Sequence, residues 1–150
     1  MRDGLETVCV ARWESPHAVR VHTELGSRRE LYAGASGKLL LAHAPSEIQE
    51  AVLSGEHQRF TPNTILQREK LEKEIAAILK NGYSVSFAER TQETVAVAAP
   101  VYDSSRAMIA AISITGPSSR ITQENLQSFI DFVKTGAVEM SRELGYAPAG

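Results

Sequence analysis

The chain has 150 residues, of which 43% are hydrophobic and 23% charged; this composition suits one globular domain and excludes a disordered or fibrous chain. The formal net charge is -2, so no domain-wide basic surface exists to bind nucleic acid phosphates, and we do not expect this chain alone to bind DNA. The single cysteine excludes an internal disulfide, and no apolar run is long enough to cross a membrane, so we expect a cytoplasmic protein.

The chain is expected to begin with two strands. Residues 6–13 (ETVCVARW) and 18–25 (AVRVHTEL) alternate apolar and polar side chains, as half-buried strands do. Between them, Ser15, Pro16 and His17 are typical turn residues. This pattern predicts an antiparallel hairpin.

Three helices are expected in the next part of the chain. Helices are predicted over residues 36–44 and 46–54, separated by Pro45 with Ser46 as the N-cap of the second. A longer helix is predicted over residues 67–81, because apolar side chains recur there at helical spacing and Gly82 follows as a stop signal.

Three further strands and a last helix complete the prediction. The strands cover residues 83–90, 94–102 and 108–116, and the short polar links between them favour antiparallel pairing. The last helix is expected to start near Thr122, because apolar residues line one side of the segment up to Leu144.

Each of these three strands has one bulky side and one mostly small side, because side chains alternate between faces. The small sides are almost uncharged, so they face something other than bulk water. They consist of Ser84, Ser86 and Ala88, then Thr94, Ala96, Ala98 and Pro100, then Ile109, Ala111, Ser113 and Thr115. Two interpretations remain open: a ligand pocket that offers the hydroxyls of Ser86, Ser113 and Thr115, or close packing against a helix or another subunit.

The segment from Gly34 to Lys38 does not form either of two familiar enzyme motifs. A phosphate-binding P-loop requires an earlier glycine and a Ser or Thr after Lys38, and a hydrolase nucleophile elbow requires a glycine where Lys38 stands. If a helix begins near Ser36, the amides of Ala35, Ser36 and Gly37 favour an anion. The alternative is that Ser36 only caps the helix, with Lys38 in solvent.

Three segments resemble the C-terminal effector-binding domain of IclR-family transcription regulators. They are GASGKLLLA (34–42), NGYSVSFAERTQETVAVAAPVYD (81–103) and AAISITGPSSRIT (110–122), in this order and spacing. The resemblance implies an α+β fold of the GAF-like or profilin-like kind, in which a curved antiparallel sheet of about six strands and flanking helices enclose a ligand pocket. The whole of residues 1–150 would form this domain.

The resemblance also implies partners. Such regulators carry an N-terminal winged helix-turn-helix module, which this chain is expected to lack because it begins almost at the first strand. The parent protein would bind operator DNA through that module, as a dimer or tetramer. The effector would be a small organic acid, with an aromatic or short-chain carboxylate as the leading class.

The family's functional positions fall on six residues of this chain. The loop that binds the effector carboxylate through backbone amides falls on Ala35 and Ser36, and the inward strand positions fall on Ser86, Ala96, Ser113 and Thr115. No catalytic residue, cofactor or metal is implied, and the four histidines show no metal-ligand spacing. Two alternatives stay open: an oligomerisation module without ligand, and a hydrolase with Ser36 as nucleophile.

Three residues of this sequence differ from residues found in other family members, two at these functional positions and one close to them. Some members place an aspartate and a cysteine where Ser86 and Ala96 stand, so we expect a less acidic and wider cavity. Glu93 stands where glycine is common, which makes a positive φ costly there. Its carboxylate, near the pocket mouth, would discourage anionic ligands unless Arg90 pairs with it.

Overall fold

The computed structural model describes residues 1–18 and 20–147. Within them the chain forms six strands and four helices, which confirms the expected α+β fold with antiparallel sheets. In chain order these are β1 (Arg2–Asp3), β2 (Glu6–Val8), β3 (Arg28–Glu30), α1 (Ala35–Ala42), α2 (Ser46–Leu53), α3 (Arg68–Asn81), β4 (Ser84–Phe87), β5 (Thr94–Tyr102), β6 (Met108–Pro117) and α4 (Leu126–Glu143).

The six strands form two three-stranded sheets, β1-β2-β3 and β4-β5-β6, rather than one continuous sheet. The predicted N-terminal hairpin is wrong: β2 ends at Val8, and no strand lies among residues 9–18 or 20–25, while Val19 is outside the described residues. Val10 and Trp13 are 59% and 85% exposed. An alternating pattern forms a strand only where a partner edge and a covering layer bury its apolar side, and backbone pairing with the β3 side ends at Cys9, which bonds to Gly26 and Ser27.

The helices lie close to their predicted ranges. Gly82 ends α3 in the left-handed conformation (φ 73°), as glycine can do without a Cβ penalty. Ser46 is the first residue of α2 rather than its N-cap, a position that Pro45 takes. The last helix starts later than Thr122, because the Asn125 side chain accepts the Thr122 N–H at 2.8 Å and holds a turn there.

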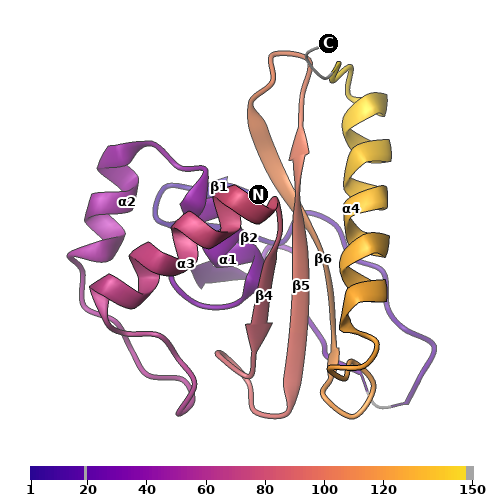
Figure 1. Cartoon of the computed structure of the whole chain (residues 1–150), viewed down its shortest axis with the longest axis horizontal. Helices are drawn as coiled ribbons and strands as arrows, with labels where there is room; N and C mark the ends of the chain where they lie inside the picture. The colour runs from indigo at the N-terminus through magenta and orange to yellow at the C-terminus, as the bar shows by residue number, and fades with distance from the viewer. Residues whose placement is uncertain (19, 148–150) are drawn as a thin grey trace.

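Helices lie on both sides of the sheet β4-β5-β6 (Figure 1). On the bulky side, Ile130 and Val133 of α4 pack against strand residues such as Val97. On the other side, α1 lies between the sheet and α3, and all but one of its eight residues are buried. The position of α1 is therefore fixed by packing around its circumference.

The strand register places the small side chains of all three strands on one face. Ser86 pairs with Ala96, which pairs with Thr115, and Ala98 pairs with Ser113 in the next row. Because paired residues of antiparallel strands point to the same side, these rows form one continuous small-residue face.

Candidate functional site

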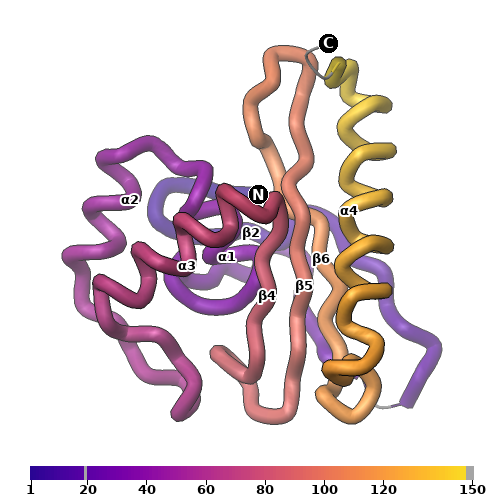
Figure 2. The backbone as a smooth tube through the Cα atoms, viewed as in Figure 1, coloured from indigo at the N-terminus to yellow at the C-terminus, as the bar shows by residue number. Residues whose placement is uncertain are grey.

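A cavity of about 1080 Å³ lies between the small-residue face, the start of α1 and the extended segment after β2, and its lining continues past the β6 edge to Phe132, Val133, Gly136 and Met140 of α4. In Figure 2 that segment makes a wide excursion between β2 and β3. The residues predicted from the sequence all line this one cavity: Ala35, Ser36, Ser86, Ala96, Ser113 and Thr115.

The small-residue face is divided between two uses. Ala98 is fully buried and belongs to the core cluster that α1 forms with α3, and Ser84 is 1% exposed. Ser86, Ala96 and Thr115 line the cavity, and Ala96 also packs against that cluster. The small residues therefore admit α1 at one end of the face and line a cavity at the other, and ligand binding in that cavity stays a prediction.

The first turn of α1 offers three free backbone amides. Gly34 precedes the helix with φ 85° and ψ 160°, a conformation open mainly to glycine, and its own N–H donates to Oε2 of Glu89 at 3.0 Å. The N–H groups of Ala35, Ser36 and Gly37 have no acceptor among the described residues. Together with the helix dipole, they form a donor set suited to an anion.

Ser36 is not the N-cap of this helix. The helix begins at Ala35, Gly34 is the N-cap, and the Ser36 hydroxyl makes no hydrogen bond within the described part of the chain. No histidine is bonded to this hydroxyl, so a general base for a Ser36 nucleophile is not in place.

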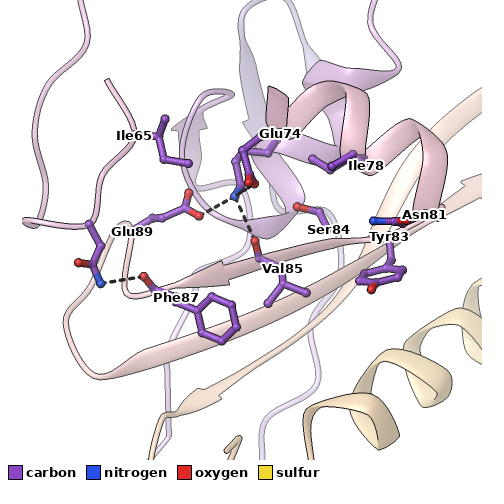
Figure 3. Close-up of a pocket in the computed structure, with 12 residues that line it drawn as sticks. Ile65, Glu74, Ile78, Asn81, Tyr83, Ser84, Val85, Phe87 and Glu89 are labelled. Atoms are coloured by element: carbon purple, nitrogen blue, oxygen red, sulfur yellow. Dashed lines mark hydrogen bonds and ion pairs between the residues drawn. The ribbon is translucent and has the colours of Figure 1, made fainter. Parts of the chain in front are cut away.

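Lys38 is buried, which corrects the expectation that it lies in solvent. Its Nζ donates to Glu89 at 2.6 Å, to Glu74 at 2.7 Å and to the Val85 carbonyl at 3.0 Å (Figure 3). A lysine at this position must point into the protein because α1 is packed on nearly every side. Two carboxylates and a carbonyl then compensate its loss of hydration.

Sequence reasoning missed the role of Glu89, which links the helix start to the sheet. One carboxylate oxygen accepts from Gly34 and the other from Lys38. The hydroxyl of Thr64 donates to the Glu89 carbonyl at 2.7 Å and holds its backbone in place. Glu89 falls within the strand predicted over residues 83–90, but β4 ends at Phe87, so strand alternation could not show that this carboxylate contacts the start of α1.

A second, smaller cavity of about 470 Å³ lies beside this ion pair, between α3 and β4 (Figure 3). The Val85 and Phe87 carbonyls along the β4 edge accept hydrogen bonds from Lys38 and Asn63. Side chains thus occupy acceptors that another strand would need, which protects this edge from pairing.

The larger cavity is lined by more positive than negative side chains. Its charged lining residues are Arg12, Glu14, Arg20, Arg29, Arg90 and Arg120. Arg90 pairs with Glu30 at 2.6 Å and lies over the Phe60 ring at 4.3 Å. This excess of guanidinium groups favours an anionic occupant.

Glu93 has the positive φ (56°) that was expected to be costly. It does not line the cavity, and Arg90 does not pair with it. Its carboxylate is therefore not placed to repel an anion there.

Neither a metal site nor a membrane span is found in the described ranges. Among residues 1–18 and 20–147, no group of three or more His, Cys, Asp or Glu side chains could hold a metal ion. No helix there combines the length and the apolar character that a membrane crossing requires.

The sequence matches a known family over residues 1–142, described as "Bacterial transcriptional regulator IclR C-terminal". The HTH-type transcriptional regulator KipR of Bacillus subtilis is 38% identical over 147 residues, which cover 97% of this chain and 59% of KipR. The chain therefore spans little more than half the length of that curated relative.

Solved structures agree with this match. The crystal structure of the Thermotoga maritima IclR superimposes with a TM-score of 0.88 at 34% identity and covers 97% of this chain and 59% of its own. An IclR homolog from Microbacterium hydrocarbonoxydans, complexed with 4-hydroxybenzoate, gives a TM-score of 0.87 at 26% identity, with 95% of this chain and 57% of its own covered.

Proposed function

The chain belongs to the family of bacterial transcriptional regulator IclR C-terminal domains, and on that basis we propose that it binds a small-molecule effector for a longer, DNA-binding regulator. The effector we propose is a small organic carboxylate, aromatic or short-chain. The regulator would act in the cytoplasm and bind operator DNA through an N-terminal module. The relatives matched are regulators rather than enzymes, which leaves the hydrolase alternative without support.

The observation that carries this proposal is the free donor set at the start of α1. The amides of Ala35, Ser36 and Gly37 lack acceptors and open onto a cavity rich in arginine. A carboxylate supplies the oxygens and the charge that such donors bind best. That a homolog is complexed with 4-hydroxybenzoate supports a carboxylate as the ligand class.

In this proposal the effector's charged end contacts the amides of Ala35 and Ser36. Its body lies against Ser86, Ala96 and the β6 side chains Ser113 and Thr115, which line the same cavity. Small side chains leave room for an apolar body, and their hydroxyls supply a few oriented hydrogen bonds. Regulation follows if the effector binds two subunit arrangements with different affinity.

The test is a thermal-shift titration of this chain with 4-hydroxybenzoate and with short aliphatic carboxylates. A ligand that binds only the folded state raises the melting temperature in a dose-dependent way. Ser36→Pro removes one amide donor at a helix position that tolerates proline, and we expect affinity to fall by about tenfold or more. Glu47→Pro is the matched control, because Glu47 is likewise the second residue of its helix, α2, and does not line the cavity.

Ala96→Trp distinguishes a ligand cavity from a packed subunit contact. If the cavity holds a ligand, the chain folds with the larger side chain and loses only ligand binding. If protein fills this space, as in the oligomerisation alternative, the same variant unfolds or dissociates.

Self-association is a second proposed function, supported by a separate observation. Trp13 and Phe132 are 85% and 71% exposed, and both lie at the rim of the large cavity. Large exposed aromatic side chains are typical of protein contacts. We expect Trp13→Ser with Phe132→Ser to lower the association order measured by analytical ultracentrifugation, whereas an unchanged order would remove this surface from the interface.

A further inference from the structure

The arginines around the large cavity are unequally paired. Arg12 and Arg20 share one carboxylate, Glu14, at 3.0 and 3.4 Å. Arg90 pairs with Glu30. Arg29 has no hydrogen bond or ion pair with any described residue, although it also lines the cavity.

The position of Arg29 removes part of the water that would otherwise surround its guanidinium group. It lies on β3 opposite Thr7 and is half-buried. Burial, and next the charge of Arg90, lower the pKa of its guanidinium from the ordinary value. The charge of Glu30 opposes these two effects only in part, and no carboxylate of the described residues lies within ion-pair distance of Arg29, so an anion at Arg29 would stabilise its charged form.

Arg90 connects this positive charge to the start of α1. A Cβ added to Gly34 would lie 3.2 Å from Cδ of Arg90, so the arginine stem packs directly against the residue before the free amides. Nη1 of Arg90 is buried and has no acceptor in the described part of the chain. Arg90 therefore lies beside the helix start, and Arg29 lines the same cavity as both.

The charges indicate how many negative charges an occupant should carry. Glu14 compensates one of its two arginine partners, and Glu30 compensates Arg90. Among Arg12, Arg20, Arg29 and Arg90, it is Arg29 that has no carboxylate of the described chain within ion-pair distance. A monocarboxylate on the amides of α1 would leave Arg29 without an anion, whereas a dicarboxylate would supply one carboxylate to the amides and one to Arg29.

We propose that the effector is a small dicarboxylate, with one carboxylate on the amides at the start of α1 and the second on Arg29. This rests on the proposed function, since it assumes that the cavity holds an organic acid. It adds a second anionic group to the ligand and makes Arg29 the residue that selects for it. A dicarboxylate bound this way would bind more tightly than a monocarboxylate of equal length, because it makes one additional charge-assisted hydrogen-bonded pair, with Arg29.

The test compares diacids with monoacids of matched size. Glutarate is measured against pentanoate, and terephthalate against 4-methylbenzoate, by calorimetric titration at constant ionic strength and neutral pH. In the unchanged chain we expect at least one diacid to bind about tenfold or more tightly than its monoacid partner. Arg29→Gln should remove that advantage and leave monoacid binding within about twofold.

Arg28→Gln is the matched control. Arg28 is the neighbouring residue on β3, pairs with Asp3 and Glu6, and does not line the cavity. The Arg28→Gln variant should keep the preference for diacids. Arg29→Lys keeps a positive charge, so this variant should retain part of the preference for diacids. It loses the bidentate geometry of a guanidinium, so the preference should be weaker.

The possible failures are distinguishable. Equal affinity for diacids and monoacids in the unchanged chain overturns the inference and leaves the proposed function standing. An equal loss of both ligand types in Arg29→Gln also overturns it, because Arg29 would then act on the shared carboxylate. Binding of no acid in either series overturns both the inference and the proposed function.

Discussion

Lys38 and Glu89 are 51 residues apart in the sequence, yet Nζ of one lies 2.6 Å from Oε1 of the other. Both side chains are buried, at 1% and 6% exposure. Glu89 also accepts the N–H of Gly34, so this ion pair fixes the start of α1 relative to the end of β4. The free amides proposed to bind the effector keep their orientation through this contact.

Removing the lysine should be strongly destabilising. Lys38→Met leaves Glu89 buried without its cation, and we expect a loss of about 3–5 kcal/mol in the free energy of unfolding. Adding Glu89→Gln should recover part of that loss, because no isolated buried charge remains. Urea denaturation measures both. Lys73→Met, at an exposed position of α3, is the control and should change stability little; a similarly small effect of Lys38→Met would contradict the prediction.

Gly37 allows α1 to approach the chain that follows β3. A Cβ at this position would lie 2.9 Å from the Leu31 carbonyl oxygen and 3.0 Å from that of Glu30. Because both atoms belong to backbone, Gly37→Ala forces the helix to shift, and we expect a destabilisation of about 1–3 kcal/mol.

Gly136→Ala tests whether this effect is specific to the close contact. On α4 the added Cβ would meet only Ile112 at 3.8 Å, an ordinary contact. Since alanine favours a helix over glycine, this control should raise stability by about 0.5–1 kcal/mol. Thermal denaturation of the two variants should therefore move in opposite directions, and a rise for both would show that α1 adjusts freely.

Glu93 stores backbone strain that glycine would relieve. Its φ of 56° is unfavourable for a residue with a side chain. We expect Glu93→Gly to raise the free energy of unfolding by about 0.5–1 kcal/mol, after the greater flexibility of unfolded glycine is counted. Glu93→Gln keeps the strain and removes the charge, so its stability should be unchanged. A change in carboxylate affinity in the Gln variant would show that this charge does reach the cavity.

The Glu30–Arg90 pair should make stability depend on pH in the acid range. Burial by itself raises the pKa of Glu30, but hydrogen bonds from its own backbone and from Arg90 lower the pKa below the ordinary value of 4.5. A carboxyl group with a lowered folded pKa contributes stability above its unfolded pKa and loses that contribution as pH falls through the folded one.

The measurement compares the unchanged chain with Glu30→Gln in urea between pH 7 and pH 3. The difference in stability should be largest at neutral pH and should shrink below pH 4.5 or so. Glu24→Gln, at an exposed position, is the control. A difference that stays constant across this range would mean that the charge of Glu30 does not contribute.

The small-residue face illustrates how far sequence reasoning reaches. The alternation in β4, β5 and β6 correctly grouped Ser86, Ala96 and Thr115, and the register placed them in one row. Alternation could not tell a cavity from a helix contact, because it records which side a residue faces and not what covers that side. Only the position of α1 showed that Ala98 is covered and that Ser86 and Ala96 line the cavity.

The sequence alone determined the local elements and the start of α1, because helix spacing, strand alternation and glycine positions act over a few residues. It placed α3 and α4 and all three strands of the second sheet close to their observed ranges. It failed at residues 9–13 and 20–25, where the local pattern was that of a strand but the structure forms none. The tertiary structure decided which charges meet, as in Lys38 with Glu89 and Glu30 with Arg90, because contacts across 51 and 60 residues depend on the path of the whole chain.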